Sequence, residues 1–167
     1  LGVKAGLLKL GFFFCLLAAF ILIFWNNLLV TPVLWLLFLT IGHGVLGFLD
    51  DFIKAEKKRN LGLTAKQKLL GQLILSVLFC WGCIETLHLP LSVSIPFLHT
   101  ELFIGSFYYI FVILVLIGGS NAVNLTDGLD GLASGCCVVA FFAYGVYCYL
   151  HGLHNLGYFI TILAGAC

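Results

Sequence analysis

Long apolar stretches with almost no charged residues recur along the chain, and short polar segments separate them. Five of these stretches are long enough to cross the hydrocarbon of a bilayer as helices, which takes roughly 20 residues each. They cover residues 11–30, 33–49, 69–87, 103–120 and 132–150. A sixth apolar run, residues 156–167, has the length of a truncated span. The pattern predicts an all-α fold: a polytopic membrane helical bundle that forms a single transmembrane domain.

The composition supports the same class of protein. Hydrophobic residues make up 62% of the 167 residues and charged residues only 9%, whereas soluble domains carry about 25% charged residues. These values exclude an ordinary soluble domain, a disordered segment and a basic nucleic-acid-binding domain. We therefore expect the chain to lie in a lipid bilayer, and we do not expect nucleic acid as a partner. Because methionine is absent and the last apolar run is short, we expect an internal part of a longer protein.

Every lysine and arginine falls on one side of the membrane if successive spans alternate in direction. These residues are Lys4, Lys9, Lys54, Lys57, Lys58, Arg59, Lys66 and Lys68. Basic residues accumulate on the cytoplasmic side of membrane proteins, so this side is predicted to be cytoplasmic. The predicted cytoplasmic loops are then residues 50–68 and 121–131.

Two adjacent acids, Asp50 and Asp51, follow the second predicted span. Adjacent carboxylates repel each other, and Mg²⁺ is a natural partner because it is often held by one or two carboxylates together with substrate phosphates. Lys54 lies three and four positions on, within reach of either acid if the helix of the span continues. The alternative is a pair of acids at the membrane surface that only forms salt bridges with neighbouring lysines.

The second cytoplasmic segment carries Asn121, Asn124, Asp127 and Asp130 at intervals of three residues. On a helix they form a broad polar strip, and they offer donors and acceptors to a polar ligand or to metal-bound water. The alternative is helix capping, which needs only one or two such residues.

The basic residues of the first segment either mark topology or attract a polyphosphorylated substrate. Together these features indicate phosphoryl transfer at the cytoplasmic surface.

Three motifs carry a resemblance to a known family: residues 47–54, 58–68 and 121–132. They resemble the bacterial phospho-N-acetylmuramoyl-pentapeptide transferases, a branch of the polyprenyl-phosphate N-acetylhexosamine-1-phosphate transferase superfamily. The paired aspartates and the Asn-x-x-Asp-Gly-x-Asp-Gly pattern are shared with the N-acetylglucosamine type, whereas residues 60–67 look like the muramoyl-pentapeptide branch. The resemblance therefore favours that branch.

The resemblance implies an Mg²⁺-dependent enzyme of the bacterial inner membrane with a cytoplasmic active site. It would transfer phospho-N-acetylmuramoyl-pentapeptide from the UDP-linked donor to undecaprenyl phosphate, giving lipid I and UMP in the first membrane step of peptidoglycan synthesis. A homodimer is a candidate assembly. The alternatives are a polyprenyl-phosphate N-acetylglucosamine-1-phosphate transferase and a membrane transporter whose acids form a relay.

Roles for individual residues also follow from the resemblance. It implies that Asp50, Asp51 and Asp127 are catalytic and bind the metal, and it leaves open which of them acts as a base. It implies substrate-binding roles for Asn121, Asn124, Asp130, Lys54 and Lys66. The family has about ten spans, with a further metal-binding aspartate and a histidine motif that this sequence lacks. We therefore expect the isolated chain to be inactive.

The charge pattern predicts that both cytoplasmic loops are inaccessible from the periplasm. Cysteines introduced as Lys66→Cys or Asn124→Cys in the complete gene product should resist an impermeant thiol reagent added to intact cells. Glu101→Cys, in a predicted outer loop, should react and is the positive control. Labelling of either cytoplasmic position would contradict a shared cytoplasmic site.

Overall fold

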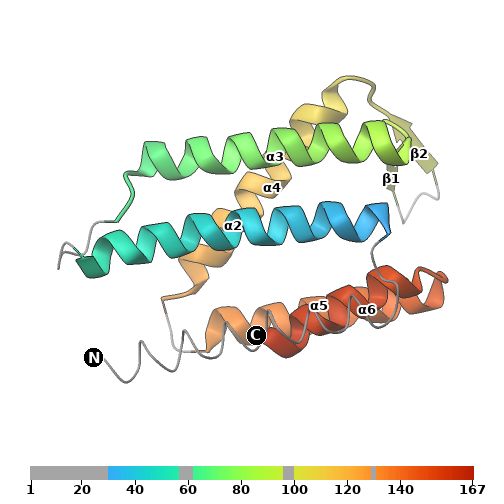
Figure 1. Cartoon of the computed structure of the whole chain (residues 1–167). Coiled ribbons are helices and arrows are strands. Elements are labelled where there is room, and N and C mark those ends of the chain that lie inside the picture. The colour runs from blue at the N-terminus through green and yellow to red at the C-terminus, as the bar shows by residue number, and fades with distance from the viewer. Residues whose placement is uncertain (1–29, 57–61, 96–99, 129–130) are drawn as a thin grey trace. The chain divides into compact units, whose positions relative to one another are not determined.

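The computed structural model of the chain describes residues 30–56, 62–95, 100–128 and 131–167 (Figure 1). These residues form the helices α2 (Thr31–Glu56), α3 (Ala65–Leu87), α4 (Phe107–Thr126), α5 (Leu132–Leu150) and α6 (His154–Ala166), and the strands β1 (Ser92–Ile95) and β2 (Thr100–Phe103). Within this part of the chain, α2 to α5 are each long and apolar enough to cross a membrane. The predicted class, a multi-pass helical membrane protein, is confirmed. The predicted span 11–30 lies outside the described residues except for its last position.

Several helix boundaries differ from the predicted spans. Helix α5 has the predicted bounds, but α2 continues through Glu56, α3 begins at Ala65, and α4 covers Phe107–Thr126 instead of 103–120. The predicted loops 50–68 and 121–131 are therefore partly helical. The physical reason is that a helix satisfies its own backbone groups, so it can continue past the apolar boundary while its polar side chains reach water.

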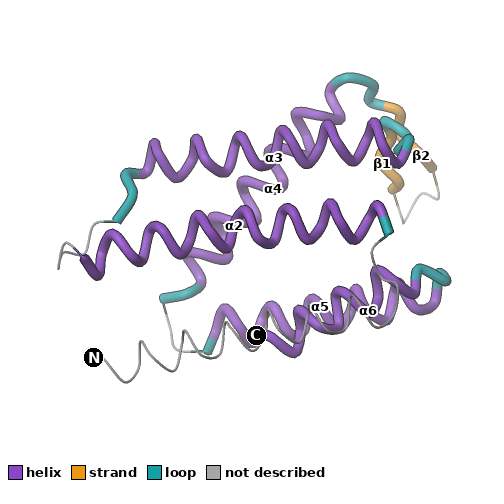
Figure 2. The backbone as a smooth tube through the Cα atoms, viewed as in Figure 1, coloured by secondary structure: helices purple, strands orange, loops and turns teal. Residues whose placement is uncertain are grey.

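A short β-hairpin is the exception to the all-α prediction among the described residues (Figure 2). Strands β1 and β2 pair antiparallel, with Ser92 opposite Phe103 and Ile95 opposite Thr100. Phe103, the first residue of a predicted span, thus belongs to a strand. The segment has an alternating pattern of serines with Val93 and Ile95, which suits a strand rather than a helix.

The described residues fall into two compact units, one within residues 34–123 and the other within residues 30–33 and 124–167. In the first unit, α2 and α3 lie side by side (Figure 1). A glycine on one helix faces a large side chain on the other in three places, where an added Cβ would overlap that side chain. The pairs are Trp35 with Gly82, Gly42 with Leu75, and Leu46 with Gly71.

These three pairs share one antiparallel register, because the chain advances by seven and then four residues along α2 while it returns by the same numbers along α3. Small residues let two helices approach closely in a membrane, where packing rather than the hydrophobic effect drives association. At one end of this interface the indole Nε1 of Trp35 donates a hydrogen bond of 2.8 Å to Thr86 Oγ1. At the other end, the same register brings Asp50 close to the segment that precedes α3.

In the second unit, α5 and α6 form a tight antiparallel hairpin. Gly152 turns the chain between them with a φ of 72°, a conformation that glycine adopts without steric cost. The amide of Leu153 donates to the carbonyl of Cys148 at 2.8 Å, and Gly157 is buried beside Cys148. The turn thus aligns two apolar helices, and Thr161 of α6, whose Oγ1 donates to the carbonyl of Gly157, faces Gly145 of α5.

Candidate active site

The paired aspartates and Lys54 meet on the last turns of α2. Lys54 Nζ lies 2.8 Å from Asp50 Oδ2 and 3.0 Å from Asp51 Oδ1. The helix continues past Asp51, as the expected reach of Lys54 requires, and the structure shows Lys54 in contact with both acids at once. A single ammonium group therefore offsets the repulsion between two adjacent carboxylates.

The two carboxylates differ in their surroundings. Asp50 is 8% exposed, and its Oδ1 accepts a hydrogen bond of 2.8 Å from the backbone N–H of Leu63. Because Oδ2 contacts Lys54, both oxygens of Asp50 have protein partners. The side chain of Asp51 is 80% exposed and contacts Lys54 through Oδ1. Asp51 is therefore the acid of the pair that an incoming metal ion or phosphate can reach.

Gly62 allows the loop to approach Asp50. A Cβ at this position would overlap both Oδ1 and the carbonyl oxygen of Asp50. Any residue with a side chain would push the backbone outward and lengthen the hydrogen bond from Leu63. We call this contact between Asp50 and residues 62–63 the Asp50 latch.

A capping box fixes the start of α3 directly after the latch. Thr64 Oγ1 accepts from the backbone N–H of Gln67 at 3.3 Å, and Gln67 Oε1 accepts from the backbone N–H of Thr64 at 3.0 Å. This reciprocal arrangement satisfies two N–H groups that a helix start leaves without partners. The sequence signal for it, Thr-x-x-Gln before an apolar run, was available but not used in the sequence analysis. Lys66 is exposed on the first turn of α3.

The second predicted segment is divided between a helix and a turn. Asn121 and Asn124 lie on α4, which ends at Thr126, and Asp127 is exposed in the following turn. The expected polar strip is thus helical only over its first two members. Asp130 lies outside the described residues. Asn124 and Asp127 belong to the unit that contains α5 and α6, so their approach to Asp51 stays a prediction.

Asn121 has a polar partner that sequence analysis missed. Its Nδ2 donates to Gln72 Oε1 at 2.9 Å and to the carbonyl of Ile117 at 2.9 Å. Gln72 lies in α3 and is 1% exposed. The available signal was a single amide within an apolar span, where polar residues are costly and usually have a partner or a function.

The donor set near Asp51 suits Mg²⁺ better than a metal held by protein ligands alone. Among the described residues, no group of three or more His, Cys, Asp or Glu side chains could hold an ion. Mg²⁺ is commonly bound through one or two carboxylates, with water and substrate phosphates completing its octahedron. The exposed carboxylate of Asp51 fits that mode, whereas the oxygens of Asp50 are already engaged.

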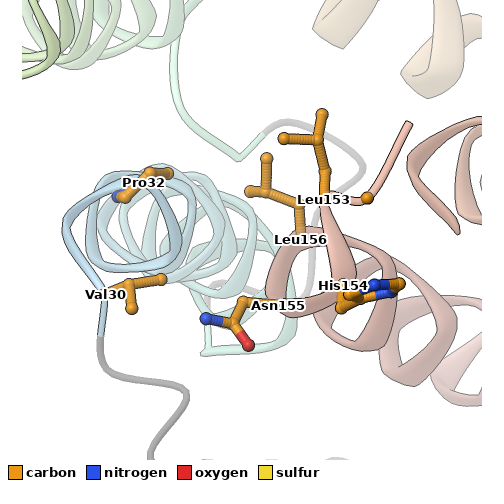
Figure 3. Close-up of a pocket in the computed structure, with 7 residues that line it drawn as sticks. Val30, Pro32, Leu153, His154, Asn155 and Leu156 are labelled. Carbon is orange, nitrogen blue, oxygen red and sulfur yellow. The ribbon is translucent and has the colours of Figure 1, made fainter.

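A pocket of about 370 Å³ lies elsewhere, in the unit that contains α5 and α6 (Figure 3). Its lining residues are Val30, Pro32, Gly152, Leu153, His154, Asn155 and Leu156. It contains no acid and faces the turn that the charge pattern predicts to be on the outer side. It is therefore not a candidate for the phosphoryl-transfer site.

The fold and the acidic cluster define a class: a multi-pass membrane protein with paired carboxylates at one end of a span. Comparison with known proteins is more specific. Residues 33–167 match glycosyl transferase family 4, and the chain belongs to this family.

Three relatives share the name phospho-N-acetylmuramoyl-pentapeptide-transferase. The chain is 43% identical over 166 residues to such a protein from Listeria innocua, covering 97% of the chain and 51% of that protein. It is 47% identical over 131 residues to one from Bacillus velezensis, covering 78% of the chain and 40% of that protein. It is 49% identical over 134 residues to one from Halalkalibacterium halodurans, covering 80% of the chain and 41% of that protein. The chain thus spans about half or less of the length of these relatives.

The Asp50 latch predicts different behaviour for two substitutions of the same residue. Asp50→Ala removes the acceptor of the Leu63 amide, so hydrogen exchange in residues 62–64 should become about tenfold faster, as expected for one lost hydrogen bond. Asp50→Asn keeps a carbonyl oxygen at that position and should exchange at nearly the original rate. Exchange measured by mass spectrometry in lipid nanodiscs checks this. Equal rates in the wild type and in Asp50→Ala would contradict the latch.

Proposed function

We propose that the complete protein transfers phospho-N-acetylmuramoyl-pentapeptide from its UDP-linked donor to undecaprenyl phosphate, forming lipid I and releasing UMP. The observation that carries the proposal is the cluster of Asp50, Asp51 and Lys54 at the end of α2. It occurs in a family 4 chain whose relatives bear the name of this transferase. A multi-pass membrane protein also suits an acceptor that is itself a lipid.

The reaction exchanges one phosphoanhydride partner of the sugar phosphate, UMP, for another, the lipid phosphate. An oxygen of the lipid phosphate forms a bond to the phosphorus that carries the sugar, while the bond from this phosphorus to UMP breaks and its electron pair leaves with UMP. Phosphoryl transfer depends mainly on positioning and on neutralising phosphate charge. Mg²⁺, when bound, would neutralise charge on the phosphate oxygens as a Lewis acid.

The surroundings of each residue suggest its role. Asp51 is exposed and would hold Mg²⁺ together with Asp127 and the substrate phosphates. Lys54, which contacts both acids, would face the same phosphates and keep the pair from repelling each other. We assign Asp50 to positioning, because Leu63 and Lys54 already occupy its two oxygens.

The remaining predicted site residues would bind the nucleotide-sugar substrate. These are Asn121, Asn124, Asp130 and Lys66. The proposed location is the bacterial inner membrane with the site at the cytoplasmic face. Two observations support this placement: all eight basic residues fall on the predicted cytoplasmic side, and Lys54 lies beside the paired aspartates.

Asp51→Asn or Asp127→Asn in the complete gene product should reduce the rate of UMP release by at least about a hundredfold, the usual effect of losing a preorganised charge at a reacting centre. Glu56→Gln is the matched control, since Glu56 is an exposed acid on the same helix and should leave the rate within about twofold. UMP release from UDP-N-acetylmuramoyl-pentapeptide in undecaprenyl phosphate-containing vesicles is the assay.

Removal of the metal gives an independent check of the same site. Chelation should abolish wild-type turnover, and added Mg²⁺ should restore it. Near-normal turnover of either aspartate variant removes that residue from the proposed catalytic set. Turnover in excess chelator contradicts the proposed use of Mg²⁺.

A further inference from the structure

Gln72 is buried in the first half of α3 and connects that helix to α4. Its Nε2 donates a hydrogen bond of 3.0 Å to Ser120 Oγ, and its Oε1 accepts one of 2.9 Å from Asn121 Nδ2. With 1% of its surface exposed, Gln72 has little access to water or lipid headgroups. The contact therefore ties two helices whose bonded residues lie 48 and 49 positions apart in the chain.

Because Gln72 is buried, its hydrogen bonds favour one orientation of α4 relative to α3. A buried amide that lacks partners costs more than the modest net gain of a hydrogen bond in water, so Gln72 favours one arrangement of α4 over others. Apolar packing alone would tolerate rotation of α4 about its axis. The amide instead selects the rotation that places Ser120 and Asn121 against α3.

The same contact determines how Asn121 presents its own amide. The Nδ2 group has two hydrogens, and its two acceptors are Gln72 Oε1 and the carbonyl of Ile117. A ligand would therefore meet the carbonyl oxygen of Asn121, which accepts a hydrogen bond. Without Gln72, the amide could rotate and present a donor in place of this acceptor.

We propose that Gln72 is a positioning residue for the nucleotide-sugar donor: it orients Asn121 so that Oδ1 accepts a hydrogen bond from an N–H or O–H group of the UDP-linked substrate. This inference rests on the proposed function. Gln72 touches neither substrate nor metal and acts only through Asn121.

Ser76 provides a matched control. It lies one turn after Gln72 on α3 and is 0% exposed, and within the described part of the chain its Oγ has no hydrogen-bond partner. Ser76→Ala thus removes a buried polar group from the same helix without removing a hydrogen bond to α4. Ser120→Ala is the second control, because it removes one hydrogen bond of Gln72 and keeps the one to Asn121.

The experiment measures KM for both substrates by UMP release from the complete gene product in vesicles that contain undecaprenyl phosphate. Gln72→Met keeps the approximate shape of the side chain and removes both hydrogen bonds. We expect it to raise KM for UDP-N-acetylmuramoyl-pentapeptide about tenfold, the equivalent of one lost hydrogen bond, while KM for undecaprenyl phosphate changes less than twofold. Ser76→Ala and Ser120→Ala should stay within about twofold for both substrates.

A double variant separates positioning from simple structural support. If Gln72 acts through Asn121, the variant Gln72→Met/Asn121→Ala should have the same donor KM as Asn121→Ala, whereas independent effects would multiply. A purely structural role would lower the amount of folded enzyme but leave KM of the folded fraction unchanged. If Gln72→Met does not fold, Gln72→Asn is used instead, since it keeps a polar amide that is too short to reach Asn121.

The outcomes distinguish this inference from the function on which it rests. A wild-type protein that releases no UMP contradicts the proposed function. An active wild type with an unchanged donor KM in the Gln72 variant, or with multiplicative effects in the double variant, contradicts the role of Gln72 and leaves the proposed function intact.

Discussion

The carboxylate of Asp50 joins the end of α2 to the start of α3, and the acidic site depends on that connection. Its two oxygens are occupied by the amide of Leu63 and the ammonium of Lys54, and Gly62 gives the loop room to approach. The glycine-to-large-residue pairs between α2 and α3 set the register that brings these groups together. A buried acid at the end of a membrane helix is stable here because each of its oxygens has a partner.

This arrangement explains how two adjacent aspartates can serve different purposes. Lys54 contacts both and lessens their repulsion, while Asp50 is buried and Asp51 is exposed. In the proposed reaction, Asp50 would support the site and Asp51 would be the metal ligand. Gln72 makes a comparable connection between neighbouring helices, since its hydrogen bonds to Ser120 and Asn121 join α3 to α4. The position of Asp50 and Asp51 near one end of α2 favours the proposed transferase over a transporter, whose acids would line the spans.

Sequence reasoning succeeded where one physical rule dominates. The length of an apolar run predicted α5 at its observed bounds, and the spacing of Asp50, Asp51 and Lys54 predicted their contact. It failed at both ends of α2 and α4 and at the start of α3, because hydropathy marks the edge of the lipid and not the end of the helix. It could not distinguish Asp50 from Asp51, since the difference lies in a loop that folds back from residues 62–63. Gln72 escaped notice because its partners are distant in the chain.

The identity of the lipid product tests the central claim most directly. The complete gene product would be supplied with undecaprenyl phosphate, Mg²⁺ and equal concentrations of UDP-N-acetylmuramoyl-pentapeptide and UDP-N-acetylglucosamine, and the lipids would be analysed by mass spectrometry. The account predicts undecaprenyl diphosphate linked to N-acetylmuramoyl-pentapeptide as the dominant product. A product that carries N-acetylglucosamine, or no lipid-linked sugar at all, would contradict it.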